Sequence, residues 1–91
     1  MANHRSALKR VRSSEKKRQR NLAVRGGART AVKRARTLIE AQQWDEAEAA
    51  VKSAVIALDR AASKGVIHKN NASRRKSRLV RGYQQARAAA Q

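Results

Sequence analysis

The chain has 91 residues, of which 23 are lysine or arginine and only 6 are aspartate or glutamate, so its formal net charge is +17. It has no cysteine, proline or phenylalanine, and its only large aromatic residues are one tryptophan and one tyrosine. The length allows one small domain, the absence of cysteine excludes disulfides and cysteine-based metal sites, and the shortage of large apolar side chains argues against an enzyme pocket.

Charge divides the chain into three segments. Residues 1–36 carry a net charge of +12, residues 37–63 a net charge of −3, and residues 64–91 a net charge of +8. Like charges at this density repel one another and weaken a compact state. A polyanion relieves that repulsion, and nucleic acid does so with a release of condensed counterions.

The first helix is expected to begin near Asn3 or Ser6 and to end near Ala41. Its second half has apolar residues at the spacing of a core-facing helix, namely Ala28, Ala31, Val32, Ala35, Leu38 and Ile39. Residues 12–21 have no apolar side chain on any face, so we expect this stretch to be frayed until a partner orders it. Gly26-Gly27 weakens a helix by about 1 kcal/mol per glycine, and we interpret the pair as a bend or a close approach to a partner.

The second helix is the clearest in the sequence. Asp45 is a suitable N-cap, and Glu48 three residues later completes a pattern similar to a capping box. An apolar stripe follows, formed by Ala47, Ala50, Val51, Ala54, Val55, Leu58, Ala61 and Ala62. Lys64 and Gly65 are typical of the end of a helix.

The third helix is expected to begin near Asn70 or Asn71, either of which is a fair cap. Its apolar positions are Ala72, Leu79, Tyr83, Ala86 and Ala90. Three helices with one stripe each predict an all-α fold, an antiparallel three-helix bundle with a long, basic N-terminal helix. We expect residues 1–91 to form a single domain, with residues 1–25 as a basic extension of the first helix and the bundle over roughly residues 28–90.

Catalysis has little support in the sequence. Histidine is the residue type most often used in acid–base catalysis, and the chain has only His4 and His68; no metal-ligand spacing or glycine-rich phosphate loop is present. The carboxylates near Asp45 favour the positive end of a helix dipole. We therefore expect no enzyme activity, no cofactor, no metal, no small-molecule substrate and no homo-oligomer.

The first binding signal is the basic run between residues 5 and 29. It has almost no acid to pair with and covers more than one helix face, so we predict phosphate binding in preference to an inert tail. Its members are Arg5, Lys9, Arg10, Arg12, Lys16, Lys17, Arg18, Arg20, Arg25 and Arg29.

The second binding signal joins a tight turn to a basic helix start, where backbone N–H groups are ready phosphate ligands. The predicted contact residues here are Lys64, His68, Lys69, Asn70, Arg74, Arg75, Lys76 and Arg78. Capping of the third helix is the simpler explanation for Asn70 and Asn71, and both roles are compatible. Trp44 and Tyr83 are expected to pack in the core, so recognition should depend on backbone and shape, not on stacked bases.

Of three other interpretations of the basic segments, only DNA compaction stays open. An N-terminal organelle-targeting segment is similarly rich in arginine, but here the basic residues return at the C-terminal end. A membrane-surface helix would show a clean apolar face, which residues 12–21 lack. DNA compaction is harder to exclude, because phosphate contacts alone do not separate DNA from RNA.

Two motifs resemble those of a known family. The opening MANHRSALKRVRSSEKKRQRN and the later KGVIHKNNASRRKSRL are similar to the two signatures of the bacterial ribosomal protein S20 family, and the likeness in length and charge layout covers essentially the whole chain. The resemblance implies a three-helix bundle bound directly to 16S ribosomal RNA among the components of the small subunit, in the cytoplasm, with no catalytic activity. It implies RNA contacts by the basic residues from Arg5 to Arg20 and by the second cluster from Lys64 to Lys76. The leading hypothesis is thus a structural RNA-binding protein of the ribosome, and the alternative is a nucleoid-type DNA compactor.

Overall fold

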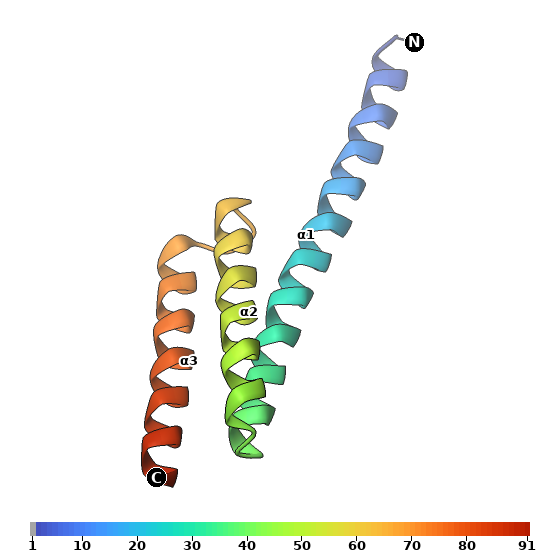
Figure 1. Cartoon of the computed structure of the whole chain (residues 1–91). Helices are drawn as coiled ribbons and strands as arrows, with labels where there is room; N and C mark the ends of the chain where they lie inside the picture. Colours follow the sequence, from blue (N-terminus) through green and yellow to red (C-terminus); the bar gives the residue numbers. More distant parts are fainter. Residues whose placement is uncertain (1) are drawn as a thin grey trace.

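A computed structural model shows three α-helices joined by two short turns (Figure 1): α1 (Ala2–Glu40), α2 (Trp44–Ser63) and α3 (Lys69–Ala90). It describes the backbone of residues 2–91 and the side chains of residues 6–91. No strand occurs within residues 2–91, which confirms the prediction of an all-α fold with a long, basic first helix.

The central helix of the three is α2. It packs against the second half of α1 on one side and against α3 on the other, whereas α1 and α3 share few contacts. The first half of α1 projects beyond the other two helices (Figure 1), and every side chain from residue 6 to residue 23 is exposed. We call residues 6–23 the arm. The resulting molecule is long and thin, 70 × 22 × 13 Å in its Cα extents.

Small side chains build the core. Its centre contains Ala35, Val51, Ala54 and Leu79, and the only large side chain with less than 2% exposure among the described residues is Leu58. Alanine at a contact lets two helices approach at the short end of the usual range of axial distances, but it buries little apolar area. The predicted stripes of all three helices face this core, although the last position of the third, Ala90, is exposed.

The start of α2 differs from the prediction. The helix begins at Trp44, its N-cap is Gln43, and no side chain caps it. The Asp45 cap and its pairing with Glu48 were therefore wrong. The cause is the tight end of α1: Gln42 adopts a positive φ of 59°, and the N–H of Gln43 bonds to the carbonyl of Leu38 at 3.0 Å. This Schellman-type closure ends α1 so abruptly that α2 begins two residues earlier than predicted, with Asp45 in its first turn.

The predicted stop at the end of α2 is confirmed. Gly65 has a φ of +75°, and the N–H groups of Gly65 and Val66 bond to the carbonyls of Ala62 and Ala61. A positive φ of this size is easily reached only by glycine. The turn delivers Val66 into the core, where its side chain is 8% exposed.

The caps predicted for α3, Asn70 or Asn71, were wrong. The helix begins at Lys69, and its cap is His68, whose Nδ1 accepts a hydrogen bond from the N–H of Asn70 at 3.1 Å. His68 has an extended backbone, so its ring can turn back over the first turn of the helix. Histidine is not among the usual cap residues, and the sequence alone gave no reason to choose it.

Gly26-Gly27 does not interrupt α1. The helix runs through both residues, and a Cβ at either position would have no protein atom within 4 Å. The pair is therefore neither a helix break nor a close contact with another part of the protein.

We predict that Leu58→Asp destabilises the bundle while Glu46→Gln scarcely changes it. Leu58 is 1% exposed, so aspartate there would place an unpaired charge in the core, costing about 3 kcal/mol or more and lowering the melting temperature by more than about 10 °C. Glu46 is exposed, and its change should stay within about 0.5 kcal/mol. Thermal melts followed by circular dichroism measure both, and equal shifts would contradict the assignment of the core stripe.

Candidate nucleic-acid interface

The arm presents most of the first predicted basic cluster to solvent. Seven of the predicted phosphate-binding residues lie in the arm, and all seven are exposed: Lys9, Arg10, Arg12, Lys16, Lys17, Arg18 and Arg20. The single acid of the arm, Glu15, pairs with Arg18 at 3.1 Å. The side chain of Arg5, also in the predicted set, lies outside the described residues.

The arm is not equally basic on all sides. Lys9, Arg12, Lys16 and Arg20 follow one another at intervals of three and four residues, so they share one side of the helix. Leu8, Val11 and Leu22 share another side, where they are 49%, 64% and 50% exposed. No helix of the protein covers either side, because the arm stands clear of α2 and α3 (Figure 1). The basic side is therefore available to a partner.

A contact at the base of the arm brings the two predicted basic clusters together. The Nη2 of Arg25 donates a hydrogen bond to the carbonyl oxygen of Val66 at 3.4 Å. Val66 lies in the turn that links α2 to α3, next to the second cluster. The exposed side chains of Lys64, His68 and Lys69 therefore lie close to the point where the arm joins the bundle.

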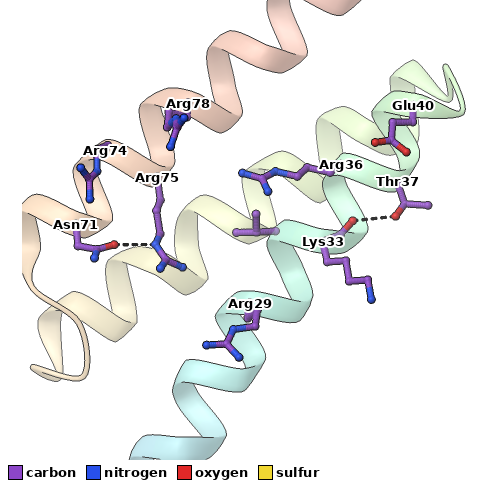
Figure 2. Close-up of a pocket in the computed structure, with 10 residues that line it drawn as sticks. Arg29, Lys33, Arg36, Thr37, Glu40, Asn71, Arg74, Arg75 and Arg78 are labelled. Atoms are coloured by element: carbon purple, nitrogen blue, oxygen red, sulfur yellow. Dashed lines mark hydrogen bonds between the residues drawn. The ribbon is translucent and has the colours of Figure 1, made fainter.

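A groove between α1 and α3 has a volume of about 710 Å³. Figure 2 shows its two walls, which come from helices far apart in the sequence. The α1 wall is formed by Arg29, Val32, Lys33, Arg36, Thr37 and Glu40, and the α3 wall by Asn71, Arg74, Arg75 and Arg78. Six of these ten side chains are cationic and one is anionic, so the groove attracts anions.

Hydrogen bonds within each wall order some of these side chains. The Nε of Arg75 donates to the Oδ1 of Asn71 at 2.7 Å, which fixes the guanidinium of Arg75 relative to α3 (Figure 2). The hydroxyl of Thr37 donates to the carbonyl oxygen of Lys33 at 3.0 Å. Asn71 thus acts inside the groove wall and does not cap α3.

Two cationic groove residues, Lys33 and Arg36, are absent from the predicted set. They follow Arg29 by four and seven residues, which places all three on one face of α1. That spacing is visible in the sequence, but it does not show that α3 lies opposite this face with its own arginines. Four predicted residues do line the groove: Arg29, Arg74, Arg75 and Arg78.

Lys76 differs from its basic neighbours because it pairs within the protein. Its Nζ lies 2.6 Å from a carboxylate oxygen of Asp59 in α2, and its side chain is 31% exposed. This ion pair links the start of α3 to the end of α2. In the free protein Lys76 is therefore occupied in holding the two helices together.

A second ionic link joins the other ends of α2 and α3. Arg87 lies 4.0 Å from Asp45 and 3.9 Å from Glu48, and it donates a hydrogen bond to the hydroxyl of Tyr83. That hydrogen bond is the largest of the effects that raise the pKa of Arg87, with the nearby carboxylates adding to it, so its charge is retained throughout the physiological range.

The two aromatic residues pack together beside Arg87. The rings of Trp44 and Tyr83 meet edge to face, with centroids 6.5 Å apart, and both residues are half-buried. Tyr83 also packs against the core cluster. Their role in packing, predicted from the sequence, is confirmed.

The described part of the chain shows neither a metal site nor a membrane-spanning helix. Residues 6–91 contain no group of three or more histidine or acidic side chains placed to hold a metal ion. None of the three helices, over their described residues, is long and apolar enough to cross a membrane.

Comparison with known proteins gives consistent matches over nearly the whole chain. A family model described as ribosomal protein S20 matches residues 2–84. The small ribosomal subunit protein bS20 of Geobacter sulfurreducens is 49% identical over 81 residues, covering 89% of this chain and 93% of the relative. The bS20 protein of Thermomicrobium roseum is 49% identical over 91% of this chain and 84% of its own length. That of an Anaeromyxobacter species is 48% identical over 98% of this chain and 99% of its own length.

Proposed function

Because the chain belongs to the ribosomal protein S20 family, we propose that it binds 16S ribosomal RNA directly through the phosphate backbone and stabilises the folded form of that RNA. As a member of this family it is a structural constituent of the small ribosomal subunit that binds ribosomal RNA, it works in the ribosome in the cytoplasm, and it is not an enzyme. The proposal concerns which RNA it contacts and with which side chains.

The observation that carries this proposal is the small number of internal ion pairs. Among the lysine and arginine side chains that the structure describes, only four form ion pairs: Arg18, Lys52, Lys76 and Arg87. The remaining positive charges have no carboxylate partner within the described residues and lie mostly at the surface. RNA phosphates would supply the missing partners, with a gain from released counterions.

The proposed contacts include every predicted residue and extend along one continuous path. The path follows the arm, crosses the junction where Arg25 meets the turn after α2, and continues onto the start of α3. In this proposal the whole chain acts as one RNA-binding domain, and the other components of the small subunit are its neighbours. Because the aromatics are packed, RNA shape and backbone would determine recognition.

Competition at fixed salt tests the proposal against the DNA alternative, which family membership does not support. The full chain should prefer folded 16S ribosomal RNA to a duplex DNA of equal phosphate concentration by more than about tenfold, since non-specific attraction alone treats the two polyanions alike. Filter-binding titrations with each unlabelled competitor measure the preference. Equal competition by DNA would contradict the proposal.

We also predict that contacts on the bundle contribute more affinity than contacts on the arm. Arg10→Ala should weaken binding modestly and lower the salt slope by about one unit or less. Replacing Lys69, Arg74 and Arg75 together by alanine should cost much more, because these residues flank a preformed turn and little ordering entropy is lost when they bind.

A matched triple variant on the arm provides the control for this comparison. Lys9, Arg10 and Lys17 changed together to alanine remove the same charge from a segment that must become ordered before its contacts count. Titrations against 16S ribosomal RNA at several salt concentrations should show a smaller loss for this arm triple. A larger loss than for the bundle triple would reverse our ranking of the two regions.

A further inference from the structure

We propose that the groove between α1 and α3 binds the sugar-phosphate backbone of a single RNA strand, held from one side by Arg29, Lys33 and Arg36 and from the other by the arginines of α3. This inference rests on the proposed RNA-binding function and adds a specific site to it. It gives Lys33 and Arg36 a role that neither the basic runs nor the predicted set assigned to them.

The width of the groove follows from the way the helices pack. Both α1 and α3 pack directly on α2 and also contact each other, so the groove lies over a seam where the two helices converge. A hollow of about 710 Å³ in such a seam has room for the backbone of one strand and not for a whole duplex. A duplex could still place one of its two strands there.

The charges of the groove suit phosphate in number and position. Arg29, Lys33 and Arg36 span seven residues of α1, or about 10 Å at 1.5 Å per residue, so consecutive phosphates would each meet cations. Arginine also holds phosphate with two parallel hydrogen bonds. The only acid, Glu40, lies beyond Arg36 at one end of the α1 wall, so the attraction is greatest between Arg29 and Arg36.

The groove is preformed, unlike the arm. Its floor contains the half-buried Val32, which packs against the core cluster, and Asn71 already orients Arg75. Both walls belong to helices held by α2, so a strand entering the groove does not have to order the backbone of either wall. Preorganisation of this kind reduces the entropic cost of binding.

The test compares two double variants of the full chain that each lose two positive charges. Lys33→Gln with Arg36→Gln removes charge from the groove. Arg34→Gln with Arg60→Gln removes the same charge from elsewhere, since Arg34 lies in a separate hollow between α1 and α2 and Arg60 is on α2. All four side chains are exposed, so both variants should fold, and thermal melts verify this.

Affinity for 16S ribosomal RNA should fall about tenfold in the groove variant, and the slope of log K against log salt should decrease by about 1.4–1.8 units for two lost phosphate contacts. The control should lose less than about threefold. If both variants lose affinity equally while the wild-type chain still prefers 16S ribosomal RNA to duplex DNA, the groove inference is overturned and the proposed function stands. If the wild-type chain shows no such preference, the proposed function itself fails.

Phosphate-ethylation interference on the same RNA tests the single-strand claim. With the wild-type chain, ethylation should interfere at several short runs of phosphates. The groove variant should lose one run of consecutive phosphates on one strand, and the control variant should keep it. Loss of phosphates on both strands facing each other across a duplex, or loss of none, would overturn the inference.

Discussion

Mutual repulsion among the positive charges is the constraint on which the rest of this structure depends. A net charge of +17 on 91 residues cannot be gathered into a compact body without a large electrostatic cost. The fold is accordingly long and only 13 Å deep in its smallest Cα extent, with a basic arm that stands apart from the bundle. An elongated shape separates the positive charges and so limits their repulsion. The same shape leaves the cationic side chains exposed, where RNA can contact them.

The position of α2 is the second consequence of this constraint. It carries most of the acids of the chain and contacts both basic helices more extensively than they contact each other. Asp59 meets Lys76 near one end of α2, and Asp45 and Glu48 meet Arg87 near the other. Each of these pairs is partly exposed and therefore weak, so their effect is to align α3 on α2 while the alanine-rich core provides most of the stability. The groove exists because α2 holds α1 and α3 side by side.

Much of the fold could be predicted from the sequence, because the helical stripes are periodic and the signals are local. Residues nearby in the sequence are enough to predict the apolar stripe centred on Leu58 and the end of α2 at Gly65. The predictions of the helix caps failed for a physical reason. The tight turns place Gln42 in a left-handed conformation and make His68 the cap of α3, and both are uncommon for these residue types. The groove could not be predicted, because Lys33 and Arg36 acquire their partners across it only through the packing of α1 and α3 on α2. Arg74, Arg75 and Arg78 were predicted from charge alone. The sequence did not show that cationic residues of α1 lie opposite them.

The arm links this account of stability to the account of function. Every described side chain of the arm is exposed, and Glu15 is its only acid, so little within the protein holds it helical except local propensity. Amide hydrogen exchange over residues 12–21, measured in the free chain and in its complex with 16S ribosomal RNA, tests directly whether RNA supplies what the protein lacks. We predict rapid exchange in the free chain and strong protection in the complex. Strong protection across these residues in the free chain would contradict the claim that the arm depends on RNA for its order.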